Sequence, residues 1–369
     1  MPKPMTAPPS IPLRTGWTTG ACATAATRAA FEGLITGEAP DPVTITLAGG
    51  QTPAFALAFA EAVGGDAWRV GIVKDAGDDP DVTHGALIVA TVRRLPLGAG
   101  IRFFAGPGVG TVTRAGLPLP PGEPAINPVP RAMMVAAVEA CAARLRVPAD
   151  LAIEISIPNG EKLALRTMNG RLGILGGLSV LGTTGIVIPY SCSAWIHAIH
   201  RGVDVARAAG LDHLIGATGA TSEAAAQAYH GLPEIALIDM GDFVGGLLKY
   251  LRQHPVPKLT LAGGFGKMTK LAQGLLDLHS KRGAVDLTWL AAQLPDASSD
   301  LRRAIETANS ALEAYQLALA EGIDLPLRVA QVAWAVAAPV LRGQGEALEI
   351  LIVDRQGAIV AGTGLRPLH

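Results

Sequence analysis

The sequence predicts a mixed α/β protein, with an α+β domain at residues 14–185 and an α/β domain at 186–345 that holds a mostly parallel sheet. In the first half, short β-like runs outnumber helical stretches, and neighbouring runs could pair antiparallel. From about Gly185, apolar runs of four or five residues alternate with helical patterns through Gly-bearing loops, which is typical of a doubly wound sheet. The length of 369 residues agrees with about two domains.

The first domain follows a Pro-rich segment, residues 1–13, that we expect to be a flexible lead. An Ala-rich helix begins near Thr18–Gly20, because Thr is a good N-cap and Ala is the strongest helix former. The turn signal Asn159-Gly160 predicts a hairpin over 151–168. Other strands are predicted at 43–47, 52–59, 68–73, 86–92 and 101–104, and a helix at 131–145.

The second domain repeats one unit of strand, Gly-bearing loop and helix. In open parallel sheets, ligands bind beyond the carboxyl ends of the strands, where such loops lie. A β-hairpin at 346–369 closes the chain. Helices are predicted at 194–210, 222–229, 243–253, 268–279, 286–321 and 327–343.

Composition excludes several classes of protein. An apolar share of 49% excludes general disorder, and a net charge of −1 makes nucleic acid a poor partner. The three cysteines are far apart and the histidines have no ligand spacing, so we expect no disulfide framework and no metal site. The longest uncharged stretch, Leu172–Ala198, contains five glycines and a proline, which argues against a membrane span. We therefore expect a cytoplasmic protein with a small-molecule ligand and no membrane partner; a homo-oligomer stays open.

Two helix starts could bind anions. Thr18, Thr19 and Gly20 precede free N–H groups at the positive end of a helix dipole, which suits a carboxylate or phosphate. Arg131 begins a predicted helix and could hold a carboxylate bidentately. An ordinary capped helix and an exposed arginine are the alternatives.

One acid-rich segment follows the strand at 68–73. Without the alternating acids, central Gly and terminal Glu of a calcium loop, it is not an EF-hand. It could present carboxylates to a cation or to hydroxyls, or it could be a solvated turn. Four carboxylates, an ammonium and an imidazole lie within eleven residues: Lys74, Asp75, Asp78, Asp79, Asp81 and His84.

The Gly-rich βα loops of the second domain predict a nucleoside-like ligand. Leu261 and Met268 stand where a Walker A loop needs Gly and Ser or Thr, so an NTPase is excluded, and no GxGxxG is present. Asp239 and Asp242 end the intervening strand and could accept hydrogen bonds from ribose hydroxyls, although each could also be a simple turn residue.

Six segments are long and compositionally unusual, in this order along the chain: LRTGWTTGACATAATRAA, VKDAGDDPDVTHG, GEPAINPVPRAMM, GRLGILGGLSVLGTTGIVIPYS, DMGDFVGG and LAGGFGKMTKLAQG. Together they resemble the CbiD family, the cobalt-precorrin-5B (C-1)-methyltransferases of cobalamin biosynthesis. The resemblance runs from about residue 13 to 275, with Trp17 where another aromatic, often Tyr, is expected.

The resemblance implies that S-adenosylmethionine methylates carbon 1 of cobalt-precorrin-5B to give cobalt-precorrin-6A, with cobalt only as part of the substrate. It also implies a fold unlike the other methyltransferases of the pathway. With this reaction in view, we assign catalysis to Asp75, Asp78, Asp79 and His84. Donor binding is assigned to Gly216, Thr218, Gly219, Thr221, Glu223, Asp239, Asp242, Gly263, Gly264 and Gly266. Substrate binding is assigned to Thr18, Thr19, Gly20, Lys74, Arg131 and Lys267.

Two other functions compete with this one. A nicotinamide-dependent corrinoid reductase lacks support because no GxGxxG with a following acid is present. A non-catalytic tetrapyrrole-binding protein would bind the corrinoid and no methyl donor.

Overall fold

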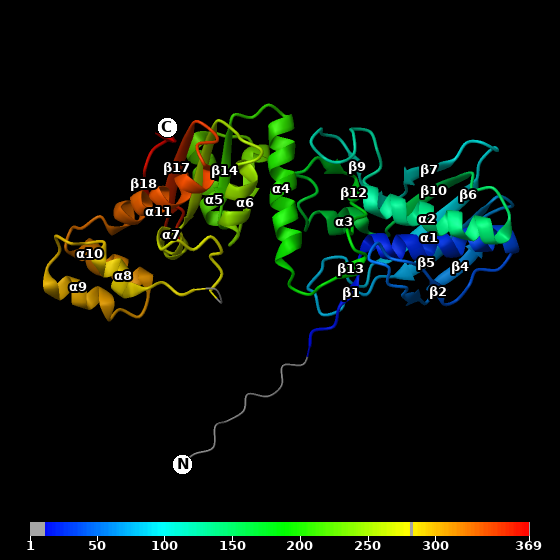
Figure 1. Cartoon of the computed structure of the whole chain (residues 1–369), viewed down its shortest axis with the longest axis horizontal. Coiled ribbons are helices and arrows are strands. Elements are labelled where there is room, and N and C mark those ends of the chain that lie inside the picture. Colours follow the sequence, from blue (N-terminus) through cyan, green and yellow to red (C-terminus); the bar gives the residue numbers. More distant parts are fainter. Residues whose placement is uncertain (1–11, 281–282, 369) are drawn as a thin grey trace, which may run out of the picture. The chain divides into compact units, whose positions relative to one another are not determined.

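The computed structural model describes residues 12–280 and 283–368. The chain divides into two compact units, Met1–Ser191 and Cys192–His369 (Figure 1), which we call unit 1 and unit 2. The division falls a few residues beyond the predicted boundary near 186. Most of the predicted lead, residues 1–11, lies outside the described residues.

Unit 1 is built on a five-stranded mixed sheet. All neighbours pair antiparallel except the last two strands, which run parallel. Side chains alternate along the strands, so that Leu151, Ile153 and Ile155 are buried while the residues between them are partly exposed. The spatial order is β4 (Phe59–Ala62), β5 (Ala67–Val73), β6 (Leu87–Arg94), β10 (Leu151–Ser156) and β7 (Ile101–Ala105).

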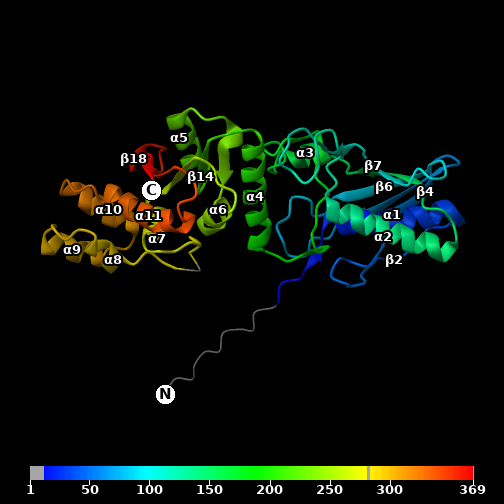
Figure 2. The same cartoon turned by 45° about the horizontal axis from the view of Figure 1, so that its top comes forward.

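Two long helices pack on this sheet and on each other. Helices α1 (Thr19–Thr36) and α2 (Pro128–Leu145) lie side by side in both views (Figures 1 and 2). Most of α1 is buried, and its small alanines let the helix approach β5 and β6 closely. At Gly33 a Cβ atom would lie 2.4 Å from the Trp68 ring, so only glycine fits there.

Short strand pairs complete unit 1. Strand β1 (Gly16–Trp17) pairs antiparallel with β13 (Ile186–Val187). The other pairs are β2 (Val43–Thr44) with β3 (Ala54–Phe55), β8 (Gly108–Val109) with β12 (Gly177–Leu178), and β9 (Thr111–Val112) with β11 (Ile174–Leu175).

The predicted hairpin over 151–168 is wrong. Strand β10 pairs with β6 and β7 instead, which come from elsewhere in the chain. Asn159 adopts a left-handed conformation (φ 63°), and Gly160 starts the short helix α3 (Gly160–Ala164). A Cβ at Gly160 would lie 2.1 Å from the carbonyl oxygen of Gly108, so this turn serves a close backbone contact.

Unit 2 has the doubly wound sheet that the sequence predicts. Its first four strands in space are parallel, and the order reverses between β14 and β16. Strand β17 is an inner strand, so the C-terminal hairpin belongs to this sheet. The spatial order is β15 (Leu237–Asp239), β14 (His213–Ala217), β16 (Lys258–Gly264), β17 (Ala347–Val353) and β18 (Ile359–Gly362), and β19 (Arg366–Pro367) also pairs with β17.

The helices of unit 2 divide between the two faces of the sheet. Helix α5 (Ala220–His230) packs over a small apolar cluster that includes Ile215, Ala262 and Leu351. The larger core involves α4 (Cys192–Ala208), α6 (Val244–Leu251), α7 (Phe265–Ala272) and α11 (Leu325–Leu341). The predicted helical region 286–321 consists of α8 (Leu287–Ala292), α9 (Ser299–Glu306) and α10 (Ala311–Ala320), which lie next to one another (Figure 2). A 3₁₀ turn, η1 (Glu234–Ala236), precedes β15.

A buried polar chain crosses the sheet under the end of α5. The Thr260 hydroxyl donates to Glu349 Oε2 (2.9 Å), so His213 Nε2, at 2.9 Å from the same hydroxyl, is its donor. His230 Nε2 lies 2.7 Å from Glu349 Oε2, and only 2% of that glutamate is exposed. Burial, followed by the nearby His230, lowers the pKa of His213 to about 4.

Within the described ranges, no helix is long and apolar enough to cross a bilayer. In the same part of the chain, no group of three or more His, Cys, Asp or Glu side chains could hold a metal ion.

Candidate functional site

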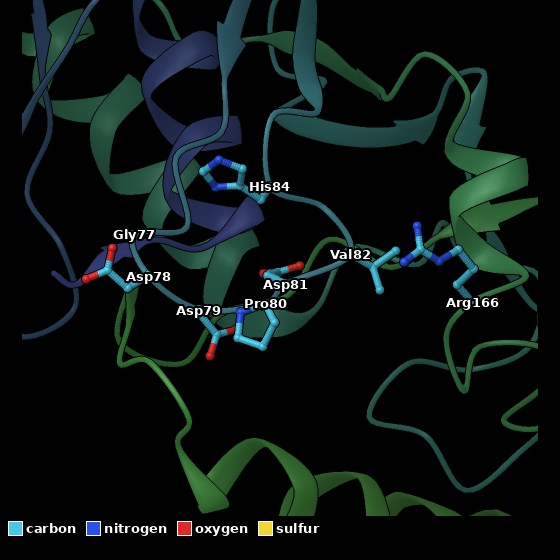
Figure 3. Close-up of a pocket in the computed structure, with 8 residues that line it drawn as sticks. All are labelled: Gly77, Asp78, Asp79, Pro80, Asp81, Val82, His84 and Arg166. Carbon is cyan, nitrogen blue, oxygen red and sulfur yellow. The ribbon is translucent and has the colours of Figure 1, made fainter. Parts of the chain in front are cut away.

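The acid-rich loop of unit 1 lines a pocket of ≈ 460 Å³ (Figure 3). Three of its predicted catalytic residues are at this pocket: Asp78, Asp79 and His84. Figure 3 shows Arg166 entering from another segment, with its guanidinium directed toward the loop. The lining residues are Gly77, Asp78, Asp79, Pro80, Asp81, Val82, His84 and Arg166.

Residues near both ends of unit 1 hold this loop in place. The Arg14 N–H donates to Asp78 Oδ2 (2.7 Å), and the Tyr190 N–H donates to Asp79 Oδ1 (2.8 Å). Gly77 has φ +67°, and a Cβ there would lie 2.1 Å from the Arg14 carbonyl oxygen, so this position requires glycine. Among the described residues, no hydrogen bond reaches the second oxygen of either carboxylate.

His84 presents an N–H group. Its Nδ1 accepts a hydrogen bond from the Ala76 N–H (3.2 Å). The neutral imidazole therefore carries its proton on Nε2. Because half of the side chain (52%) is exposed, this N–H can donate to a ligand in the pocket.

Asp75 serves the loop and is not among the residues that line the pocket. The Arg14 guanidinium pairs with it, and the Gly77 N–H donates to Asp75 Oδ1 (2.9 Å). The hydrogen bond from Arg14, followed by that from Gly77, lowers the pKa of Asp75. It therefore stays ionised and positions the loop.

Lys74, predicted as a cation for substrate acids, is paired inside the loop. Only 2% of it is exposed, and its ammonium contacts Asp81 Oδ2 and the Thr83 hydroxyl. Burial alone would raise the pKa of Asp81, but the Lys74 charge and hydrogen bonds from Lys74 and Thr83 together lower it. Two of the three ammonium N–H groups are therefore engaged inside the loop, and the side chain is almost fully buried.

Arg131 and the start of α1 are likewise engaged internally. Arg131 donates to the carbonyls of Ile126 (2.8 Å) and Pro124 (3.0 Å) and pairs with Glu123 (2.9 Å). This fixes the loop before α2. The sequence could not reveal these partners, because main-chain carbonyls carry no residue signature.

At α1, the Thr18 hydroxyl accepts from the Ala21 N–H (3.2 Å), and the Gly20 N–H donates to the Leu181 carbonyl (3.0 Å). Thr18 and Thr19 are buried. Because the Gly20 and Ala21 N–H groups already have internal acceptors, the structure gives no support to the prediction that Thr18, Thr19 and Gly20 bind substrate.

Arg166 is the residue that the sequence did not indicate. It follows α3, it is exposed, and its guanidinium forms no hydrogen bond or ion pair with the described residues. No local motif marks it, because it reaches the pocket only through the fold. A free guanidinium at a pocket is suited to bind a carboxylate bidentately.

In unit 2, a lysine connects three loops at the carboxyl ends of the strands. Lys267, in α7 after β16, donates to the Thr218 carbonyl (2.9 Å) after β14. Its ammonium also lies 3.2 Å from Asp242 Oδ1, in the loop after β15. Both contacts are internal, but 39% of the Lys267 side chain is exposed, so its role as a substrate cation stays a prediction. Asp242 Oδ1 is buried and accepts no hydrogen bond from the described residues.

The predicted donor-binding glycines separate into two groups. Gly216 and Gly263 lie within strands, where a Cβ would clash with Leu247 (2.4 Å) or Met268 (2.5 Å), so they serve packing. A Cβ at Gly219 would meet nothing within 4 Å. Similarly open are Gly264, with its nearest atom at 3.9 Å, and Gly266, with its nearest at 4.0 Å.

Two acids also belong to this edge. Glu223 is buried in the first turn of α5, and Asp239 is the last residue of β15. Thr221 is exposed in the same first turn. These residues and the open glycines lie where the strand order reverses or next to it, which is where ligands bind in open α/β sheets.

The fold is that of an α/β protein of two units, each with a candidate small-molecule site. The CbiD family model matches residues 6–189, and the model of the CbiD C-terminal domain matches residues 277–364. The chain belongs to the CbiD family.

Similar curated proteins carry the name cobalt-precorrin-5B C(1)-methyltransferase. One from Bradyrhizobium sp. is 60% identical over 96% of this chain and 94% of that protein. One from Paramagnetospirillum magneticum is 61% identical over 94% of this chain and 97% of that protein. A crystal structure described as cobalamin biosynthesis protein (cbiD) from Archaeoglobus fulgidus covers 73% of this chain and 83% of that one, at 25% identity and a TM-score of 0.40.

Proposed function

We propose that the protein transfers a methyl group from S-adenosylmethionine to carbon 1 of cobalt-precorrin-5B, which gives cobalt-precorrin-6A in cobalamin biosynthesis. The observation that carries this proposal is the 60% identity, over nearly the whole chain, to relatives named for this reaction. The donor enters as the ordinary biological methyl source for such a transfer.

The donor's sulfonium supplies an electrophilic methyl group, so that a carbon–carbon bond forms at carbon 1 while sulfur keeps the electron pair of the broken carbon–sulfur bond. The protein's part is mainly to hold the two reactants in line, which can contribute up to about 7–11 kcal/mol. Asp78 and Asp79 each have an oxygen free to accept a proton that the macrocycle loses, and His84 Nε2–H can donate to a substrate oxygen.

We assign the donor to the carboxyl edge of β14, β15 and β16 in unit 2. The residues there fit a charged nucleoside. Space is open beside Gly219 and Gly264, the first N–H groups of α5 follow Gly219, and Asp239 ends the next strand. Asp242, in the loop after β15, belongs to the same edge, where its Oδ1 lies 3.2 Å from the Lys267 ammonium.

We assign the macrocycle to the pocket of unit 1. Corrinoid intermediates carry acetate and propionate side chains, and Arg166 offers a free guanidinium for one of them. Asp78, Asp79 and His84 line the same pocket from the acid-rich loop.

One experiment tests the function directly. The purified protein is incubated with the corrinoid and a methyl-labelled donor, and the product is analysed by mass spectrometry. Gain of one labelled methyl group supports the proposal. A corrinoid product reduced by NADPH would favour the nicotinamide-dependent reductase. Saturable corrinoid binding without binding of S-adenosylhomocysteine would favour the non-catalytic tetrapyrrole-binding protein.

Replacing Arg166 with alanine should raise the KM for the corrinoid about tenfold or more, because a charge-assisted hydrogen bond contributes roughly 1.5–3 kcal/mol. Binding of S-adenosylhomocysteine, measured by calorimetry, should not change. Arg166→Lys should recover part of the loss, and the exposed Arg102→Ala is the matched control. An unchanged KM in Arg166→Ala would remove this residue from the substrate site.

Asp78 and Asp79 are each replaced with asparagine. The variant that lacks the proton-accepting carboxylate should have a kcat about a hundredfold lower. Stability should change by less than about 1 kcal/mol, since the asparagine oxygen can still accept the main-chain N–H of Arg14 or Tyr190. Steady-state kinetics and urea denaturation measure the two effects. Normal turnover in both variants would show that the loop is a solvated turn.

A further inference from the structure

A half-exposed tryptophan lies next to the proposed donor site without a role in the core. Trp195 is in the first turn of α4, and 46% of it is exposed. Aromatic residues make up only 4% of this chain, and exposing one loses the free energy that its burial would bring. An exposed indole beside the carboxyl edge of the sheet, where we assign the donor, suggests that a ligand covers its face.

The ring is fixed in one orientation. Its Nε1–H donates to the carbonyl of Asp239 (3.0 Å), the last residue of β15. Phe243 packs against it in a tilted arrangement, with ring centroids 6.4 Å apart. Helix α4 contacts both β15 and α6, so the backbone that carries the indole is also supported (Figure 1).

Gly241 allows the ring to lie over the main chain. It has φ +52°, and a Cβ there would lie 3.2 Å from the indole. The loop between Asp239 and Asp242 therefore passes under the ring, with little space between them. The tryptophan therefore packs directly on the segment that carries the two acids assigned to the donor's ribose.

The spacing of these groups matches the parts of a nucleoside. In doubly wound folds, an acid about 20 residues beyond the Gly-rich turn accepts the ribose hydroxyls. Asp239 stands 20 residues after Gly219, at the end of the second strand of the parallel series. The base attached to that ribose must lie close by, and a rigid aromatic face is the surface on which a base stacks.

We propose that Trp195 is the platform on which the adenine ring of the methyl donor stacks, with Gly241 as the residue that gives the indole its place. The inference rests on the proposed function, because it assumes a donor with a purine base. It assigns Trp195 a role in positioning and specificity, and no part in the proton chemistry.

Calorimetric titration with S-adenosylhomocysteine tests this without the corrinoid. Trp195→Ala should raise the dissociation constant of S-adenosylhomocysteine about tenfold, because stacking on an aromatic ring contributes roughly 1–3 kcal/mol per base. Trp195→Phe should keep most of the affinity. Gly241→Ala retains the indole but displaces it, so it should weaken binding as well. Urea denaturation confirms that each variant is folded.

Intrinsic fluorescence gives an independent readout. Addition of S-adenosylhomocysteine should change the tryptophan emission of the unmodified protein and of Trp334→Phe, whose indole bonds the Leu348 carbonyl elsewhere in unit 2. The change should be absent in Trp195→Phe. If the unmodified protein binds the ligand while Trp195→Ala binds equally well, the platform is overturned and the proposed function stands. If the unmodified protein does not bind it, both are overturned.

Discussion

Replacing Lys74 with methionine should destabilise unit 1 by about 3 kcal/mol, because removal of one partner of a buried ion pair costs roughly 3–5 kcal/mol. The lower value applies since 24% of the Asp81 side chain is exposed and can regain some hydration. Asp81 would keep its bonds from the Thr83 N–H (2.7 Å) and hydroxyl (2.6 Å) but lose its cation. Urea denaturation, with hydrogen exchange at the amides of β5 and β6, reports the loss for this unit.

The matched control is Lys162→Met, which makes the same change at an exposed residue of unit 1 and should stay within about 0.5 kcal/mol. The double variant Lys74→Met with Asp81→Asn should regain part of the lost stability, because it leaves no unpaired charge. A single Lys74→Met variant as stable as the control would show that the pair contributes nothing.

Lowering the pH from about 6.5 to about 4 should remove about 3 kcal/mol from the stability of unit 2 through His213. Burial, then His230 and Lys258, lower the pKa of this imidazole to about 4, while Asp212 opposes them. The pKa of the same imidazole in the unfolded chain is the ordinary 6.5. Between pH 6.5 and about 4 the unfolded chain therefore holds a proton that the folded chain does not. Unfolding therefore takes up a proton, and its free energy falls as the pH falls, at about 1.36 kcal/mol per pH unit.

His213→Gln should flatten this part of the pH profile, because glutamine can still donate to Thr260 but does not titrate. The exposed His197→Gln is the control and should leave the profile unchanged. Urea denaturation at a series of pH values measures both. A slope between pH 6.5 and 4 that persists in His213→Gln would place the titrating group elsewhere in the chain.

The fold was more predictable in unit 2 than in unit 1. Parallel strands of unit 2 follow their own helices in order, so the local alternation of apolar runs and helical patterns indicates the topology. In unit 1, β10 pairs with β6 and β7, and nothing local in 151–168 reveals those partners. Asn159-Gly160 therefore suggested a hairpin where the chain starts a helix.

The candidate site shows the same division. The acid-rich loop was predictable because its residues are consecutive, and it does line a pocket. The sequence predicts that Lys74 and Arg131 bind substrate because only their charge is visible in it, whereas their internal partners depend on the fold. Arg166 was missed for the opposite reason, since an isolated arginine becomes notable only when the chain brings it to the loop.

The pairing of β1 with β13 has a consequence for how unit 1 could be exchanged between proteins. It brings residues 14–17 and 186–190 together, so that the whole unit could be spliced into another chain at a single place without cutting its sheet. The same two segments, through Arg14 and Tyr190, hold Asp78 and Asp79. A chimera joined at Gly185, before β13, would lose the hydrogen bond from Tyr190 to Asp79. A joint after Ser191 keeps both hydrogen bonds and the β1–β13 pair.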